Sequence, residues 1–400
     1  MPTLINIVCS DCGAIFPKEY DRYTCSSCEG SIRFNYNYST VKFYSDVPSI
    51  WKYRDLLPIN SDKYISLGEG KTRIVKSRKI GPALGLTNLY FKDETRNPTQ
   101  SFKDRAMSVG VSKVLELGGT CVATASSGNA AISLAAYSAA ANLKNYSFVS
   151  ENIDPSKLAR LNLYGSKIIK VREAEFGDSA AKLLSVSCKE FNWHPVPSFG
   201  AFNPYQREGV KTISYELNED LKDIDYVFSG VGSGGLLAGV GLGFADLLAL
   251  NKINKLPCLV GVQSAKFSPF VDAMERNIKP NELVPSKNEF TIADGLADPL
   301  PWDYDLAREF VNKSNGFVMR VTDEDILSAV EDLAKFESIA SEPSGCAVVA
   351  ALKRAIKLGL IEKTAKIVLV ISGNGSNNSS VLANKFPIIN PNLMELKKVL

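Results

Sequence analysis

From about residue 65 onward, short runs of apolar residues alternate with longer segments in which apolar residues recur with a helical period. Short apolar runs predict buried strands, and their alternation with helices predicts an α/β fold with mainly parallel strands. The expected strands are 89–92, 121–125, 147–150, 167–171, 226–229, 259–263 and 367–371. The expected helices are 104–117, 130–141, 155–164, 178–191, 236–250, 323–336 and 344–358.

The first 35 residues carry two CxxC pairs, Cys9 with Cys12 and Cys25 with Cys28, separated by 12 residues. Each CxxC turn directs two sulfurs to one point, so the spacing is typical of a zinc site with four thiolates. Four thiolates leave no open coordination position, and a zinc ion bound here is therefore expected to be structural and not catalytic. The alternative, four unliganded thiols, leaves this segment without a sufficient core of its own.

The composition is that of an ordinary soluble protein, with 45% hydrophobic and 22% charged residues in a chain of 400. This length allows two or three domains with filled cores. The formal charge of +3 and the absence of long runs of like charge disfavour a nucleic-acid partner. No apolar stretch has the length of a signal peptide or a membrane span, so we expect a cytoplasmic protein without a membrane partner. In a reducing compartment, cysteines are metal ligands or buried residues and not disulfides.

A single histidine, His194, is present in the chain. Ser-His-Asp hydrolysis, histidine-rich zinc catalysis and HExxH proteolysis are therefore excluded. We expect His194 itself to be a packed or surface residue. Any chemistry must depend on lysine, carboxylates, hydroxyls or a cofactor.

Three loops follow predicted strands at their C-terminal ends, where open α/β sheets bind ligands. The first loop is 97–105, in which Ser101 is expected to cap the following helix. Lys103 then lies in the first helical turn, where the helix dipole disfavours a cation and lowers the pKa of the amine. By itself, a lysine next to Asp104 is most often half of a surface ion pair.

The other two loops offer hydrogen-bond donors for anions. Residues 125–129 join a strand to an alanine-rich helix and present backbone N–H groups, two hydroxyls and an amide, which can hold a carboxylate. Residues 229–236 contain four glycines between a strand and a helix, which lets the backbone close around a phosphate. This loop is not a Walker loop, and it lacks the acidic residue that dinucleotide-binding folds place about 20 residues further on.

Six motifs occur in a fixed order over residues 65–380. They are NPTQSFKDR at 97–105, SSGN at 126–129, NPY followed by EGVKT at 203–212, SGVGSGGL at 229–236, EPS at 342–344 and SGNG at 372–375. In this order they resemble the threonine synthases, which belong to the tryptophan synthase β-like, fold type II pyridoxal-phosphate enzymes. The CxxC pairs also resemble the N-terminal extension of some members.

The resemblance implies a fold of two open, mainly parallel sheets flanked by helices. It implies three parts, a zinc-ribbon-like extension at 1–35, a large pyridoxal-phosphate-binding domain at 36–104 and 210–400, and a small mobile α/β domain at 105–209. The resemblance also implies a homodimer.

Carried over to this chain, the resemblance makes Lys103 the catalytic residue, which binds pyridoxal phosphate as a Schiff base and shuttles protons. The cofactor-binding residues that it implies are Phe102, Lys103, Asn129, Gly232, Ser233, Gly234, Gly235 and Ser372. Asn129 would bond the phenolic oxygen, the glycine loop would hold the phosphate, and Ser372 would face the pyridine nitrogen. A neutral hydroxyl at that nitrogen favours elimination or replacement over transamination.

On the substrate side, Ser126, Ser127 and Gly128 would receive the carboxylate of an amino acid. The match then departs from the family pattern at Gln100, Ala130, Ala201, Gln206 and Ser233. In particular, Gln206 stands where an arginine usually holds the substrate phosphate. Arg207 follows one residue later, turned by about 100 degrees on a helix, so Gln206 and Arg207 are both candidate substrate-binding residues.

The function that the motifs favour is that of a lyase of threonine biosynthesis, converting O-phosphohomoserine and water to threonine and phosphate. A serine or threonine dehydratase, or a β-replacement enzyme similar to cysteate or cysteine synthase, is the alternative, because residues 291–297 resemble dehydratases. A third possibility is a non-catalytic relative that only binds pyridoxal phosphate. In each case the partner is a small amino-acid molecule.

Overall fold

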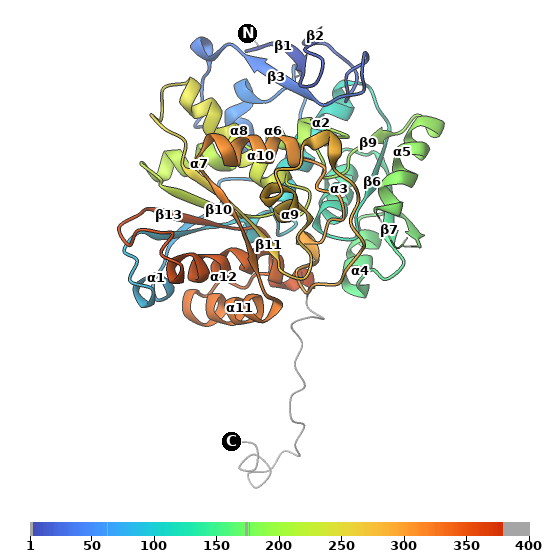
Figure 1. The fold of residues 1–400 in the computed structure, drawn as a ribbon. Helices are drawn as coiled ribbons and strands as arrows, with labels where there is room; N and C mark the ends of the chain where they lie inside the picture. Colours follow the sequence, from blue (N-terminus) through green and yellow to red (C-terminus); the bar gives the residue numbers. More distant parts are fainter. Residues whose placement is uncertain (1–2, 62, 173–174, 176, 379–400) are drawn as a thin grey trace.

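The computed structural model of the protein describes residues 3–61, 63–172, 175 and 177–378. These residues form three sheets, and helices pack around the two larger ones (Figure 1). The α-helices are α1 (Ile80–Ala83), α2 (Lys103–Glu116), α3 (Asn129–Ala140), α4 (Pro155–Leu163), α5 (Ser179–Phe191), α6 (Tyr205–Val210), α7 (Thr212–Asp220), α8 (Gly235–Ala249), α9 (Pro269–Glu275), α10 (Tyr304–Lys313), α11 (Asp323–Glu337) and α12 (Pro343–Lys357). Short 3-10 helices lie at Tyr38–Thr40, Ile50–Leu56, Glu94–Arg96, Pro280–Glu282, Asp294–Leu296 and Gly375–Asn378. Within the described ranges, no helix is long and apolar enough to cross a membrane.

The N-terminal sheet lies at the top of the molecule in Figure 1, beside α6, α8 and α10. It consists of β1 (Leu4–Cys9), β2 (Ile15–Pro17) and β3 (Ile32–Tyr36), which are antiparallel, with β1 in the middle. Its own core is small, because Ile7 and Ile32 are buried together with only two of the cysteines. A sheet of three short strands with so few buried apolar groups needs a further cross-link for stability.

The larger parallel sheet has six strands in the order β12-β11-β10-β13-β5-β4. These strands are β4 (Ile74–Lys76), β5 (Leu89–Asp93), β10 (Tyr226–Gly230), β11 (Cys258–Ser264), β12 (Phe317–Val321) and β13 (Ile367–Ile371). Within this sheet β4 alone runs antiparallel, at one edge. Helices α8 and α10 cover one face, and α12, with α11 outside it, covers the other (Figure 1). Because both faces are covered, the central strand β13 is apolar and buried along its whole length.

The smaller parallel sheet has four strands in the order β8-β7-β6-β9. They are β6 (Cys121–Ala125), β7 (Lys144–Ser150), β8 (Lys167–Val171) and β9 (His194–Pro195). Helices α3 and α5 both pack on β6 and β7. The two parallel sheets, flanked by helices, confirm the predicted fold class.

Every strand and helix predicted from the hydrophobic pattern is present, and three strands, Cys121–Ala125, Lys167–Val171 and Ile367–Ile371, have the predicted bounds. The prediction missed β1 to β4, β9 and β12, and helices α1, α6, α7, α9 and α10. Strands β4 and β9 have only three and two residues, too few for a pattern. Helix α7 buries polar side chains such as Glu216 in ion pairs, so its polar positions do not mark a solvent-exposed face.

Candidate active site

A cavity of about 420 Å³ lies at the C-terminal ends of strands from both parallel sheets. The β6–α3 loop lines it from the smaller sheet, and the β10–α8 loop and the residue after β13 line it from the larger sheet. Open α/β sheets bind ligands at this edge because loops and helix N-termini converge there. Its walls include the residues assigned to the cofactor and the substrate carboxylate, which are Phe102, Lys103, Ser126, Ser127, Gly128, Asn129, Gly232, Ser233, Gly234, Gly235 and Ser372.

Lys103 is the first residue of α2, and its amine lies in the cavity. Nζ is 4.7 Å from the centroid of the Phe102 ring, and no side chain of the described residues accepts a hydrogen bond from it. Burial lowers the pKa of Lys103 to about 8, against the opposing influence of the carboxylates of Asp303, Asp298 and Glu342. The direction matches the expectation from sequence, and desolvation on burial is its main cause.

The loop before Lys103 is held by Asp104 and not by Ser101. The predicted Ser101 cap is wrong, because Phe102 occupies the N-cap with helical dihedral angles, and Ser101 Oγ is buried without a partner among the described groups. The Asp104 carboxylate instead accepts hydrogen bonds from Thr99 N at 2.6 Å, from Thr99 Oγ1 at 2.5 Å and from Ser133 Oγ at 2.5 Å. It is therefore not an ion-pair partner of Lys103, and it fixes the turn that carries the lysine.

Arg105 holds the same helix turn through buried ion pairs. Its guanidinium lies 2.8 Å from Glu94 and 2.7 Å from Glu216, and Lys92 lies 2.6 Å from Glu216. All four side chains are buried, so the pairs are scarcely screened by water. This network ties α2 to β5 and α7. It accounts for the buried charge of Arg105, which lies two positions after the lysine in the motif.

Asn129, the first residue of α3, is oriented by Glu342. Its Nδ2 donates to the two carboxylate oxygens of Glu342 at 2.9 and 3.0 Å, and its Oδ1 is buried without a partner among the described groups. Burial, followed by the charge of Asp294, raises the pKa of Glu342 to about 7. The EPS motif marked Glu342 in the sequence, but nothing in the sequence indicated its contact with Asn129.

The loop Gly232–Gly235 closes tightly at the N-terminus of α8. Gly234 has a φ of +100°, a conformation that favours glycine, and a Cβ on Gly232 would lie 2.6 Å from the carbonyl oxygen of Gly295. Only glycines allow this close approach of backbone to backbone. The loop and the helix N-terminus therefore form a cradle that fits a phosphate.

The β6–α3 loop contributes two serine hydroxyl groups to the cavity wall. Ser127 Oγ accepts a hydrogen bond from Ser150 N at 2.6 Å, and Ser126 Oγ accepts one from Gly128 N at 3.2 Å. With the phosphate cradle, the reactive amine and the unpartnered oxygen of Asn129, this wall makes a site that fits a phosphorylated ring and the carboxylate of an amino acid. The residues present therefore fit pyridoxal phosphate.

The candidate substrate residues Gln206 and Arg207 do not line this cavity. Gln206 is buried against α2, with Nε2 3.9 Å from Met107 Sδ, and Arg207 pairs with Asp303 at 3.1 Å. The cavity instead contains two other cations, Lys157 on α4 and Arg172 after β8. Neither was singled out from the sequence, because neither lies in a motif.

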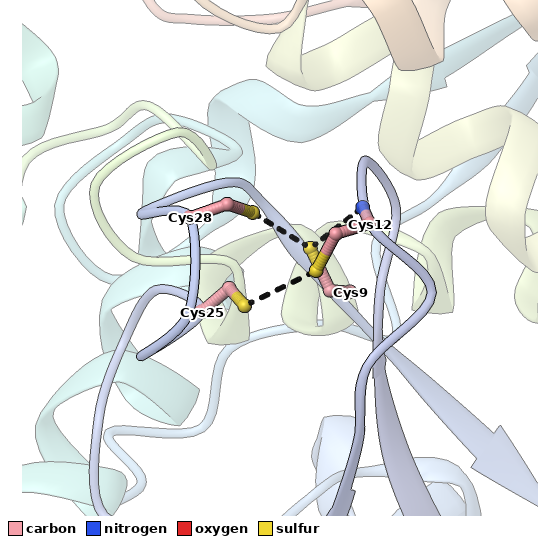
Figure 2. A group of neighbouring side chains, drawn as sticks. All are labelled: Cys9, Cys12, Cys25 and Cys28. Atoms are coloured by element: carbon pink, nitrogen blue, oxygen red, sulfur yellow. Dashed lines mark hydrogen bonds between the residues drawn. The ribbon is translucent and has the colours of Figure 1, made fainter.

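The four cysteines of the two CxxC pairs converge, as Figure 2 shows. Their sulfur atoms all lie within 4.8 Å of one another. The Sγ of Cys9 is 3.5 Å from that of Cys28, and the Sγ of Cys12 is 3.7 Å from that of Cys25. Four sulfurs at these separations suit tetrahedral coordination of zinc.

The family model described as pyridoxal-phosphate dependent enzyme matches residues 65–373 of the chain. The threonine synthase of Methanosarcina acetivorans is 32% identical over 379 residues, which cover 93% of this chain and 92% of that protein. The threonine synthase of Methanocaldococcus jannaschii is 32% identical over an alignment of 406 positions, which covers 98% of each chain.

Solved structures of the same fold include serine racemase from maize, with a TM-score of 0.66 and 24% identity over 78% of this chain and 91% of that chain. Threonine deaminase isoform 2 from Solanum lycopersicum has a TM-score of 0.64 and 23% identity over 82% of each chain. At these identities the likeness concerns the fold, and it agrees with the architecture predicted from the motifs.

Proposed function

Because the chain belongs to the pyridoxal-phosphate dependent enzyme family, we propose that it is a threonine synthase, a lyase that converts O-phosphohomoserine and water to threonine and phosphate. The observation that carries the proposal is the convergence of Lys103, Asn129 and the glycine loop on one cavity. Relatives that match nearly the whole chain are named threonine synthase, which supports the same assignment.

When bound, pyridoxal phosphate acts as an electron sink for the α carbon of an amino acid. Lys103 is the residue that we assign to binding the cofactor and to moving protons. With a pKa of about 8, roughly a tenth of the amine is neutral near pH 7 and can accept a proton, far more than for an ordinary lysine. None of the described side chains accepts a hydrogen bond from Nζ, so the amine is available to a cofactor bound in the cavity.

The other residues hold and orient the reactants. The loop Gly232–Gly235 would hold the cofactor phosphate, Asn129 the phenolic oxygen, and Ser372 the ring nitrogen. A hydroxyl such as that of Ser372 does not keep the nitrogen protonated, and this favours elimination and replacement. The hydroxyl groups of Ser126 and Ser127 and the N–H of Ser127 would orient the substrate carboxylate, with Gly128 leaving room for its approach. The N–H groups of Ser126 and Gly128 already donate to Phe148 O and Ser126 Oγ.

For the substrate phosphate we propose Lys157 as the main anchor, with Arg172 as a second cation. Lys157 is buried in the cavity wall and is paired with Asp294, whose side chain is about half exposed. A lysine whose partner is so exposed can exchange it for a phosphate without leaving a buried charge unpaired. This assignment replaces Gln206 and Arg207, which lie outside the cavity.

Several further features follow from the family resemblance. We propose that residues 105–209 form a small domain that moves relative to the large domain at 36–104 and 210–400, that the enzyme is a cytoplasmic homodimer, and that it binds one structural zinc. Analytical ultracentrifugation tests the dimer. Metal analysis of protein purified without chelator tests the zinc, for which about one ion per chain is expected.

The deciding experiment incubates the cofactor-loaded protein with O-phosphohomoserine and follows phosphate and threonine together. The proposal requires both products in equal amounts. Release of ammonia and a keto acid from serine or threonine, without phosphate release, would establish a dehydratase instead. The segment 291–297, which resembles dehydratases, supports this alternative, because its residues Asp294 to Ala297 line the cavity. Bound cofactor without turnover of any amino acid would indicate a non-catalytic binding protein.

A further inference from the structure

A chain of polar contacts runs from the N-terminal sheet to the glycine loop through Arg207. Arg207 Nη2 donates to Ser31 Oγ at 3.0 Å, and Nη1 donates to Asp303 Oδ1 at 3.1 Å. Asp303 in turn donates its backbone N–H to the carbonyl oxygen of Ser233 at 2.8 Å. Arg207 and Asp303 thus connect Ser31, which lies close to Cys28 in the sequence, with the loop assigned to the cofactor phosphate.

Asp303 is packed directly against the glycine loop. Its side chain is 0% exposed, and its two carboxylate oxygens accept hydrogen bonds from Gly200 N at 3.0 and 3.1 Å. A Cβ on Gly235 would lie 3.1 Å from Asp303 Oδ2, and a Cβ on Gly234 would lie 3.3 Å from Asp303 O. The position of Asp303 therefore limits where this part of the loop can lie.

Arg207 is the cation that keeps this buried carboxylate in place. A buried carboxylate is tolerated when a charge and hydrogen bonds compensate its lost hydration. Arg207, whose side chain is 5% exposed, supplies the charge. Its planar guanidinium directs donors from two separate nitrogens, one to Asp303 and the other to Ser31, whereas the single nitrogen of a lysine would have to lie within reach of both partners at once.

The structure assigns to Arg207 the role of a positioning residue for the cofactor. Through the contacts of Arg207, the N-terminal sheet and its metal site influence the binding of the cofactor phosphate. The inference rests on the proposed placement of the cofactor phosphate at the glycine loop. Without metal, the turn that carries Ser31 loses its cross-link, and the guanidinium becomes accessible to water. Asp303 is then held less firmly against the loop, and the cofactor binds more weakly.

The test measures the affinity for the cofactor and not turnover. Cofactor-free protein is titrated with pyridoxal phosphate, and binding is followed by visible absorbance. Arg207→Lys is expected to weaken binding about tenfold, the equivalent of one charge-assisted hydrogen bond, and Ser31→Ala about threefold. Tyr23→Phe is the matched control, because it also removes one hydroxyl of the N-terminal segment, whose hydrogen-bond partner at 2.8 Å is His194 and not Arg207 or Asp303. This variant should bind the cofactor as the wild type does.

Two further titrations separate the explanations. Removing zinc with a chelator should weaken cofactor binding in the wild type but have little further effect in Ser31→Ala. Pyridoxal, which lacks the phosphate, should bind all variants alike. The inference is overturned if Ser31→Ala binds pyridoxal phosphate with wild-type affinity after zinc removal, or if Tyr23→Phe weakens binding as much as Ser31→Ala does. It is also overturned if the variants lose as much affinity for pyridoxal as for pyridoxal phosphate. None of these outcomes depends on O-phosphohomoserine, so failure of the proposed reaction would leave the test intact.

Discussion

Lys103 owes its reactivity to its surroundings and not to its sequence neighbours. Asp104 accepts hydrogen bonds from Thr99 and Ser133, and no carboxylate of the described residues forms an ion pair with the Lys103 amine. We expect Lys103→Ala to abolish the visible absorbance of the bound cofactor and to lower turnover by more than roughly 10²-fold. Circular dichroism should show a folded protein, because the side chain lies in a cavity and not in the core. Turnover near the wild-type rate would refute the assignment.

Lys157 is the residue on which recognition of the substrate phosphate is expected to depend. Replacing it with glutamine removes a buried cation, and we expect Lys157→Gln to raise KM for O-phosphohomoserine by about 10- to 100-fold, the equivalent of one or two charge-assisted hydrogen bonds. kcat should change less. Lys170→Gln is the control, because Lys170 is an exposed lysine outside the cavity wall whose amine donates a hydrogen bond to the Glu151 carbonyl oxygen. Steady-state kinetics that show equal effects of the two variants would contradict the assignment.

Glu342 should make stability depend on pH. Its pKa rises from 4.5 to about 7 in the folded protein, so the folded state binds more protons than the unfolded state between these values, and the free energy of unfolding falls as pH rises through them. In Glu342→Gln the side chain cannot ionise, so its free energy of unfolding should not fall in this way as pH rises. The variant should therefore gain up to roughly 3 kcal/mol relative to the wild type between about pH 4.5 and pH 7. Urea unfolding of cofactor-free protein at several pH values measures the difference in the free energy of unfolding between the variant and the wild type. This difference should grow between about pH 4.5 and pH 7, and a difference that is constant with pH would contradict the prediction.

At the scale of elements, α2 carries the reactive lysine and is held by its packing on α6. A Cβ on Gly209 of α6 would collide with the carbonyl oxygen of Arg105 on α2. Because backbone atoms cannot move aside as side chains do, Gly209→Ala should lower the free energy of unfolding by about 3 kcal/mol or more. Chemical denaturation measures this value.

Gly110→Ala provides the control on the same helix pair. There the added Cβ would meet only side chains, at 3.0 Å from Val196 Cγ1 and 3.3 Å from Gln206 Cγ. The gain in helix propensity is of the same order as the strain, so the change should stay within about 1 kcal/mol. A loss as large as that of Gly209→Ala would mean that general crowding, and not the backbone contact, limits the α2–α6 interface.

At the scale of the whole molecule, the cavity is lined by both parallel sheets, so a bound cofactor should couple them. At a concentration of about 100 times its Kd, pyridoxal phosphate should stabilise the folded state by about 2.7 kcal/mol. Differential scanning calorimetry should show two transitions without cofactor that merge into one at a higher Tm with it. A shift in one transition alone would show that the cofactor contacts one sheet only.

The sequence by itself determined the features that depend on short stretches of chain. The strand at 121–125, the amine at Lys103, the glycine loop 232–235 and the paired cysteines all appear where pattern and motif predicted them. The carboxyl ends of parallel strands meet at one edge of a sheet. The convergence of the motifs on one cavity was therefore predictable from local periodicity and strand direction.

The tertiary structure alone decided which distant side chains complete the site. Glu342 and Lys157 reach the cavity, while Arg207 turns away to pair with Asp303 and Ser31. Local periodicity tells which neighbours share a face of one element. It does not give the order in which strands lie side by side, which brings β13 between β10 and β5. That order is set by the burial of apolar surface and by charge pairing between segments far apart in the chain. These interactions form only when the chain folds, so local patterns in the sequence do not reveal them.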